Sequence, residues 1–272
     1  MNIAVLGIGN MGRALVGGLK RVYGDDVRII GWDKAKSALK ELDGVAEAVA
    51  PHDWKTAGFT PDAVILSVKP ADIAGALEDI AVASREQDFR ALIISVAAGI
   101  TIASIREKLG HDARICRVMP NTPAQIGEGM SAYALSENCT SEDTRFAERI
   151  LGACGKALSV PENLMDAVTG LSGSGPAFVY SFIEALAEGG VSAGLPYTTA
   201  LDIAVQTVIG AARMVQATGE HPSVLRSKVM SPGGTTVKGL QALERGAFRS
   251  AVMSAVTEAA AQSVKMQISQ GR

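Results

Sequence analysis

The stretch Asn2–Gly12, with the sequence NIAVLGIGNMG, decides the fold of this chain. Its first six residues form a short apolar run, which is typical of a buried strand in a parallel sheet. The glycines that follow fit the pattern G-x-G-x-x-G and lead into an amphipathic segment that extends to about Val22. A strand, a glycine-rich turn and a helix in this order predict a unit that binds a dinucleotide, with a turn that binds no ligand as the alternative.

Each glycine of this turn has a separate role in the prediction. Gly7 makes the tight turn, Gly9 lets the backbone approach a pyrophosphate, and Gly12 lets the helix pack closely on the strand. The anion then lies over unpaired N–H groups at the positive end of the helix dipole. The predicted cofactor-binding residues of the turn are Gly7, Ile8, Gly9, Asn10, Met11 and Gly12.

The first half of the chain repeats this alternation of strand and helix. Segments with helical spacing, such as Ala35–Leu42, lie between the apolar runs. The further predicted strands are Val27–Trp32, Ala63–Val68, Ala91–Val96, Arg114–Met119, Gly129–Leu135 and Ala157–Val160. Such alternation implies right-handed crossovers and a mostly parallel sheet. We therefore expect an α/β fold in which residues 1–160 form a Rossmann-type, doubly wound domain.

The strand patterns stop at about Pro161, and residues 161–272 are expected to form an all-α domain. Its predicted helices are Pro176–Gly190, Tyr197–Thr218, Ser223–Val229 and Thr235–Ile268. Several of them are apolar nearly all round, so they must be buried from several sides. A segment this short cannot cover them alone. The sequence therefore predicts that this domain forms an isologous dimer.

The bulk composition excludes several classes of protein. Hydrophobic residues make up 47% of the chain and charged residues 20%, which is typical of a globular protein with a substantial core. The formal net charge is −2, and no cluster of Lys and Arg is present, so nucleic acid is not an expected partner. No apolar run approaches the about 20 residues that cross a membrane. No export signal is found either, and we expect a cytoplasmic protein.

Cysteines and histidines do not form a recognisable site. The three cysteines and three histidines are scattered, without a CxxC motif or the spacing of metal ligands. We expect reduced thiols and no metal site, and a histidine-based catalytic triad has as little support.

Two opposing signals follow the second predicted strand. Asp33 lies about 20 residues beyond the glycine turn, where a carboxylate accepts hydrogen bonds from the ribose 2′-OH and repels a 2′-phosphate. Lys34 and Lys36 follow directly and favour such a phosphate. An Asp before a helical segment is also a common helix cap. The choice between NADH and NADPH stays open at this point.

Polar or small residues also follow two later strands. Open α/β sheets bind ligands at the carboxyl ends of their strands, so these segments are further candidates for the cofactor site. They comprise Ser67, Val68, Lys69 and Pro70 after one strand, and Ala97, Ala98 and Gly99 after the next. Arg117–Pro123, with the sequence RVMPNTP, adds two prolines around an amide and a hydroxyl and forms a stiff turn. An ordinary strand-to-helix turn is the alternative for each segment taken alone.

Two glycine-rich loops precede helices in the second half. They are Thr169–Pro176 (TGLSGSGP) and Ser231–Thr236 (SPGGTT). Successive N–H groups at such a point form an anion-binding nest that fits a carboxylate as well as a phosphate. The second loop lacks the lysine of a P-loop, so a nucleoside triphosphate is not indicated. A helix start capped by Ser or Thr is the alternative.

Taken together, the motifs resemble those of the Δ1-pyrroline-5-carboxylate reductase family, which catalyses the last step of proline biosynthesis. The resemblance rests on GIGNMG, SVKP, SVAAG, RVMPNTP, TGLSGSGPA and SPGGTT, which follow in this order over nearly the full length. It implies a Rossmann domain followed by an all-α domain that interleaves with a second subunit. It further implies that dimers assemble into larger rings, commonly as a pentamer of dimers.

The resemblance also assigns site residues. The glycine turn and Ser67–Pro70 would hold the cofactor, usually NADPH, with Ala97–Gly99 near the nicotinamide. The substrate, a small cyclic imine carboxylate, would be held by Ser231, Gly233, Gly234, Thr235 and Thr236. Thr236 matches the threonine that hydrogen-bonds the substrate nitrogen, and it is the candidate catalytic residue. Asp33 departs from the neutral or basic residue of many members, which keeps NADH as an alternative cofactor.

The implied reaction transfers a hydride from nicotinamide C4 to C5 of the imine and gives L-proline. The signature loops contain no His, Asp or Glu as an obvious acid, so the imine is expected to bind already protonated. Catalysis would then rest on holding C4 and C5 about 3–3.5 Å apart in a dry cleft.

Two other functions are weighed against this one. A β-hydroxyacid dehydrogenase needs a catalytic lysine in its helical half, and Lys228, Lys238 and Lys265 do not lie in that family's motif. A non-catalytic regulator that binds NAD(P) would have no need for the SPGGTT loop.

Overall fold

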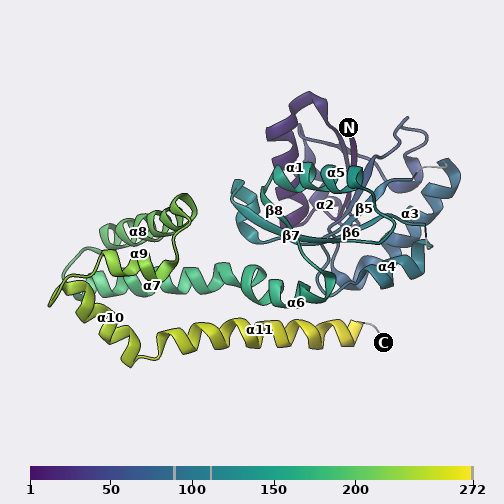
Figure 1. The fold of residues 1–272 in the computed structure, drawn as a ribbon. Helices are drawn as coiled ribbons and strands as arrows, with labels where there is room; N and C mark the ends of the chain where they lie inside the picture. Colours follow the sequence, from purple (N-terminus) through teal and green to yellow (C-terminus); the bar gives the residue numbers. More distant parts are fainter. Residues whose placement is uncertain (88–89, 111, 271–272) are drawn as a thin grey trace. The chain divides into compact units, whose positions relative to one another are not determined.

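The computed structural model describes residues 1–87, 90–110 and 112–270 of the chain (Figure 1). The chain divides into two compact units. One comprises Met1–Gly173 together with the C-terminal segment from Glu258, and the other comprises Ser174–Thr257. The chain therefore crosses between the units twice. It does so after Gly173, just before the first helix of the second unit, and again after Thr257, inside the last helix.

An eight-stranded sheet forms the centre of the first unit, in the order β3-β2-β1-β4-β5-β6-β7-β8. All neighbouring strands are parallel except β6 and β7. The strands are β1 (Asn2–Leu6), β2 (Arg28–Trp32), β3 (Glu47–Ala48), β4 (Ala63–Leu66), β5 (Leu92–Ser95), β6 (Ile115–Met119), β7 (Gly129–Leu135) and β8 (Gly155–Ser159). The predicted mostly parallel sheet is confirmed. The sequence missed only β3, because its two residues are exposed and form no apolar run.

Helices cover both faces of this sheet, as a doubly wound fold requires. Side chains of β1 alternate between the faces: Ile3 and Val5 pack in the core beneath α1 and α5, whereas Ala4 and Leu6 pack beneath α3 and α4. All four are at most 2% exposed, since strands of a parallel sheet are buried on both sides. The helices are α1 (Asn10–Tyr23), α5 (Ser141–Gly152), α3 (Ile73–Gln87) and α4 (Ile102–Leu109).

Short elements connect these layers. The predicted helix Ala35–Leu42 is a single helical turn, α2 (Lys36–Leu39), followed by a 3-10 turn at Lys40–Leu42. Further 3-10 turns lie at Gly24–Asp26, Pro51–Asp53, Pro70–Asp72, Thr122–Ile126 and Glu162–Leu164. The last of them leads into the helix α6 (Met165–Val168) and a π-helical turn at Thr169–Gly173. A hydrogen bond of 2.6 Å from Ser263 Oγ to Asp166 Oδ1 joins α6 to the C-terminal segment of this unit.

The cysteines are free thiols. Cys116 and Cys154 are buried, and burial raises the pKa of the Cys154 thiol to about 11 and that of Cys116 further still. Cys154 packs directly against Gly18 of α1, and its thiol donates a hydrogen bond of 3.3 Å to Ala14 O. These two thiols therefore serve the packing of the core.

The second unit is all helical. It contains α7 (Gly175–Ser192), α8 (Tyr197–Thr218), α9 (Pro222–Lys228), α10 (Thr235–Arg245) and the first part of α11 (Phe248–Gln270). The prediction of one helix over Thr235–Ile268 is wrong. The backbone breaks at Gly246 and Ala247, and Ala247 has a φ of 52°, a left-handed conformation that a right-handed helix cannot contain.

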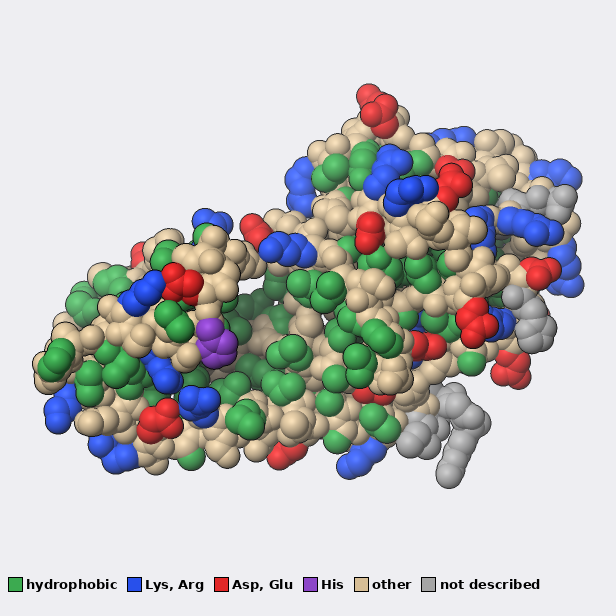
Figure 2. Space-filling model, viewed as in Figure 1, with side chains coloured by type: hydrophobic (Ala, Val, Ile, Leu, Met, Phe, Trp, Pro, Cys, Tyr) green, Lys and Arg blue, Asp and Glu red, His purple; other side chains and the backbone are tan. Residues whose placement is uncertain are grey.

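Ser174–Thr257 buries very little of its apolar surface. Its buried residues are three alanines, Ala187, Ala200 and Ala204. Many large apolar side chains are exposed, such as Tyr180 at 59%, Ile203 at 53% and Met253 at 67%. Figure 2 shows hydrophobic side chains spread over the visible surface of the helical part. A patch of this kind marks an interaction surface.

Within the described residues, none of the helices combines the length and the hydropathy that a membrane span requires.

Candidate dinucleotide and substrate sites

The glycine turn has the geometry that its sequence predicts. Gly7 has a φ of +95°, and a Cβ there would lie 2.5 Å from the backbone carbonyl carbon of Ser67. A Cβ on Gly12 would overlap the carbonyl oxygen of Gly7. At Gly9 a Cβ would meet no atom within 4 Å. Gly7 and Gly12 are thus required by the fold, whereas Gly9 leaves open space in front of the backbone.

The start of α1 fits an anion. Gly9 is its N-cap, and no side chain caps the first turn. Its own carbonyl accepts the first helical hydrogen bond, from Arg13 N at 2.9 Å. The first N–H groups of a helix have no partner inside the helix, and they lie at the positive end of its dipole. These features fit the pyrophosphate of a dinucleotide.

Asp33 is tied to the glycine turn by its side chain. Its Oδ2 accepts a hydrogen bond of 2.8 Å from Ile8 N, and its Oδ1 accepts one of 2.8 Å from Ala35 N. Asp33 therefore stabilises the start of the α2 region and fixes the turn at the same time. Both oxygens point at backbone amides.

The side chain of Lys34, after β2, reaches the connection that follows β4. Its Nζ lies 2.5 Å from Oδ1 of Asp72, which ends the 3-10 turn after β4. The lysine side chain is 75% exposed and the aspartate side chain 31%. This ion pair spans the carboxyl end of β1, because β2 and β4 flank β1 in the sheet.

A cleft of about 550 Å³ lies at this edge of the sheet. The predicted site residues that line it are Gly7, Gly9, Asp33, Lys34, Ser67, Val68 and Lys69. The residues that the sequence analysis missed are Leu6, Trp32, Ala35, Ala71, Asp72, Gly75, Ala76 and Asp79. Helical spacing could have revealed part of them, since Asp72, Ala76 and Asp79 recur on one face of the segment after the SVKP motif. The cleft lies at the point where the strand order reverses around β1, the usual ligand position in such folds.

The remaining predicted cofactor residues do not line this cleft. Ile8 is 2% exposed and contributes its N–H to Asp33, and Asn10 and Met11 form the first turn of α1. Pro70 begins the 3-10 turn that ends at Asp72. Ala97, Ala98 and Gly99 follow β5, the neighbour of β4, and Gly99 adopts a φ of +76°.

The RVMPNTP and TGLSGSGP motifs contact each other. Asn121 Nδ2 donates to Ser172 O at 3.3 Å and to Ser172 Oγ at 3.2 Å, and Asn121 Oδ1 accepts from Met130 N at 2.9 Å. A Cβ on Gly173 would overlap Met119 Cε. Asn121 thus fixes the π-helical turn to the carboxyl end of β6. Insertions of this type in helices are frequent at functional sites.

The SPGGTT motif forms the turn before α10 in the helical unit. Gly233 has a φ of +72°, and Gly234 N donates to Ser231 O at 2.9 Å. Gly234 is the N-cap of α10, and no side-chain hydrogen bond caps this helix. Thr236 is half-buried in the first turn. The predicted substrate residues Ser231, Gly233, Gly234, Thr235 and Thr236 thus gather around an uncapped helix start.

The parallel sheet, the glycine turn and the cleft at the strand-order reversal define a Rossmann-type oxidoreductase that binds a nicotinamide dinucleotide. Residues 2–99 match the family model described as NADP oxidoreductase, coenzyme F420-dependent, and residues 162–266 match that for pyrroline-5-carboxylate reductase dimerisation. A pyrroline-5-carboxylate reductase from Methanosarcina acetivorans is 40% identical over 97% of this chain and 97% of its own length. The chain belongs to the pyrroline-5-carboxylate reductase family.

Solved structures support the same assignment. A pyrroline-5-carboxylate reductase from Coxiella burnetii aligns with a TM-score of 0.88 at 34% identity, over 97% of both chains. One from Plasmodium falciparum with NADP bound aligns with a TM-score of 0.83 at 29% identity, over 98% of both chains. The α/β fold with an all-α second half, predicted from the sequence, is therefore confirmed.

Proposed function

We propose that this chain reduces Δ1-pyrroline-5-carboxylate to L-proline with NADPH, the last step of proline biosynthesis. The observation that carries the proposal is the full-length match to pyrroline-5-carboxylate reductases, in a chain that keeps the glycine turn and the uncapped SPGGTT turn. A β-hydroxyacid dehydrogenase shares the plan of two domains but not these motifs.

The cofactor is proposed to bind along the cleft beside β1. When bound, the reduced nicotinamide supplies the hydride. The N–H groups of Asn10 and Met11 donate hydrogen bonds to the pyrophosphate. It can approach the backbone closely at Gly9, because no side chain fills the space there. Asp33 has both oxygens turned to backbone amides, and Lys34 stands beside it for a 2′-phosphate. NADPH is the proposed cofactor on this ground, and NADH is the alternative.

The cyclic imine is proposed to bind at the SPGGTT turn. N–H groups around Gly233, Gly234 and Thr235 donate hydrogen bonds to the substrate carboxylate, because a helix start without a cap favours an anion. The Thr236 hydroxyl orients the imine nitrogen. The turn contains no acid, so the imine binds with its nitrogen protonated, and the C=N electron pair moves to nitrogen as the C5–H bond forms.

The assembly is proposed to be a pentamer of dimers. The match of residues 162–266 to a dimerisation family and the exposed apolar side chains of the helical unit support the dimer step. The cytoplasmic location stays a prediction from the sequence.

Turnover of NADPH with pyrroline-5-carboxylate, followed by absorbance at 340 nm, tests the proposal. Thr236→Ala should lower kcat by about 10- to 100-fold, the loss expected for one hydrogen bond in a desolvated site. Thr236→Ser keeps the hydroxyl and should retain most of the activity. Both variants should bind NADPH like the parent chain. An unchanged kcat in Thr236→Ala removes this residue from the mechanism, and NADPH binding without turnover by the parent favours a non-catalytic regulator.

A further inference from the structure

Carboxylates outnumber ammonium groups among the side chains that line the cleft beside β1. Three carboxylates line it, those of Asp33, Asp72 and Asp79, and two ammonium groups, those of Lys34 and Lys69. Three negative and two positive charges leave a net charge of −1 in the cleft. A phosphate that carries nearly two negative charges is repelled unless one cation turns to it.

Lys34 is the cation in the best position for this role, but it already has a partner. It follows Asp33 directly at the end of β2, where the ribose of a dinucleotide binds in this fold. Its ammonium group lies 2.5 Å from Asp72 Oδ1 and is largely exposed. Exposed ion pairs are weak, so a phosphate can take the lysine from the aspartate at a small cost.

Asp33 does not compete for Lys34 in the same way. Its two oxygens accept hydrogen bonds from Ile8 N and Ala35 N, both at 2.8 Å, which hold the carboxylate toward the backbone. Asp72 therefore differs from Asp33 in function, although both line the cleft.

We propose that Asp72 sets the cofactor preference by competing with the 2′-phosphate of NADPH for the Lys34 ammonium group. This inference rests on the proposed dinucleotide site. With NADH no 2′-phosphate is present, and the Lys34–Asp72 pair stays closed over the carboxyl end of β1. With NADPH the lysine exchanges one anion for another, and Asp72 remains nearby as an unpaired negative charge. Asp72 thus lowers the preference for NADPH that Lys34 would otherwise give.

Binding of two nucleotide fragments to the full-length protein tests this competition. Adenosine 2′,5′-bisphosphate carries the distinguishing phosphate and 5′-AMP does not, and isothermal titration at pH 8 gives a Kd for each. Asp72→Asn keeps the shape of the side chain and removes its charge. It should tighten the bisphosphate about fivefold and change the Kd of 5′-AMP less than about twofold. The kcat/KM ratio for NADPH over NADH should rise by the same factor.

A double-mutant cycle separates the pair from the general field of the cleft. In a Lys34→Ala background, Asp72→Asn should change the ratio of the two Kd values by less than about twofold, since the contested ammonium group is gone. Asp79→Asn is the matched control, because Asp79 lines the same cleft and does not pair with Lys34. It should change the ratio less than Asp72→Asn does.

The proposed competition is wrong if Asp72→Asn raises the affinity for both nucleotides equally. It is also wrong if the higher affinity for the bisphosphate persists in the Lys34→Ala background. If the parent binds both fragments and Asp72→Asn changes neither, this inference fails while the dinucleotide site stands. If the parent binds neither fragment nor NADPH, the proposed cofactor site fails and takes this inference with it.

Discussion

At the scale of single residues, the glycines of the first turn divide into those that the fold needs and one that only the proposed cofactor needs. Gly9 has a φ of −76°, and a Cβ there would touch nothing within 4 Å. Gly9→Ala should therefore keep the melting temperature within about 3 °C, since no contact is lost or strained. The methyl group would occupy the space proposed for the pyrophosphate. We expect NADPH to bind at least about tenfold more weakly, measured by fluorescence titration.

Gly17 provides the control for this substitution. It lies in the same helix, and a Cβ there also meets nothing within 4 Å. Gly17→Ala should raise the free energy of unfolding by about 0.5–1 kcal/mol through helix propensity and leave NADPH binding unchanged. Equal NADPH affinity in Gly9→Ala and Gly17→Ala would show that the cofactor does not approach the backbone at Gly9.

The packing roles of Gly7 and Gly12 could be predicted because a missing side chain has few physical uses, and a Cβ at either position would overlap the backbone. The role of Asp33 could not, because its carboxylate can point to a ribose or to the backbone from the same sequence position. The structure shows it bonded to Ile8 N and Ala35 N. Asp72 was missed altogether, since its partner Lys34 lies 38 residues away and only the sheet order brings the two together.

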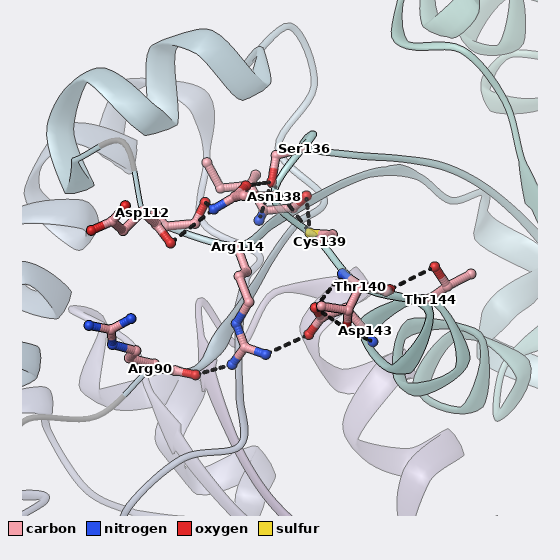
Figure 3. A network of polar contacts seen from close by, with 11 residues as sticks. Arg90, Asp112, Arg114, Ser136, Asn138, Cys139, Thr140, Asp143 and Thr144 are labelled. Atoms are coloured by element: carbon pink, nitrogen blue, oxygen red, sulfur yellow. Dashed lines mark hydrogen bonds and ion pairs between the residues drawn. The ribbon is translucent and has the colours of Figure 1, made fainter.

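At the scale of elements, α5 depends on one buried carboxylate at its start. Asp143 Oδ2 accepts hydrogen bonds from Thr140 N at 2.8 Å and from Thr140 Oγ1 at 2.9 Å, while its Oδ1 lies 2.7 Å from Arg114 Nη1 (Figure 3). Arg114 also donates to Arg90 O. The side chain of Asp143 is only 4% exposed. The residue thus closes a capping box and ties α5 to the strand connections beside it.

Asp143→Ala should lower the free energy of unfolding by about 2–4 kcal/mol. The loss combines a helix cap with a partly buried arginine that is left without its partner. Urea unfolding followed by circular dichroism measures the change. Thr144→Val is the control, because Thr144 only donates to Thr140 O from an exposed position and should stay within about 0.5 kcal/mol of the parent. A loss below 1 kcal/mol in Asp143→Ala would mean that this network does not anchor α5.

Elements with a clear pattern of apolar residues could be predicted from the sequence, and a break within a helical segment could not. The seven strands that the sequence predicted all occur, and most of them are buried strands of the parallel part of the sheet, which are nearly continuous apolar runs. The break between α10 and α11 was missed. The segment around Gly246 and Ala247 keeps an alanine-rich helical pattern, and a single glycine is tolerated in helices. Only the backbone shows that Ala247 leaves the right-handed region.

At the scale of the whole molecule, the two units differ in how they bury apolar surface. The sheet unit has two cores with large, fully buried side chains such as Trp54 and Phe59. The helical unit buries only alanines among its described residues. The apolar pattern of its helices predicted a dimer from the sequence, and the structure shows the physical ground for that prediction as exposed apolar side chains that one chain leaves uncovered.

Ile203 of α8 tests whether a second subunit covers this surface. It is 53% exposed in the single chain, and Val22 of α1 in the sheet unit has the same exposure of 53%. Full burial of an isoleucine contributes about 1.5–3 kcal/mol, so covering the exposed half of Ile203 contributes roughly half of that, and an aspartate there adds a charge that must leave water. Ile203→Asp should therefore shift the mass measured by light scattering toward the monomer at micromolar concentration. It should also lower the melting temperature in a way that depends on protein concentration.

Val22→Asp places the same charge on a side chain of equal exposure, so it should leave both the mass and the melting temperature close to those of the parent. If both variants keep the parent mass, Ile203 lies outside the interface and the apolar face of α8 has another use. If both dissociate, the sheet unit takes part in assembly as well. A shift that is confined to Ile203→Asp assigns the association to the helical unit, because both substitutions place the same charge on an aliphatic side chain of equal exposure, but in different units.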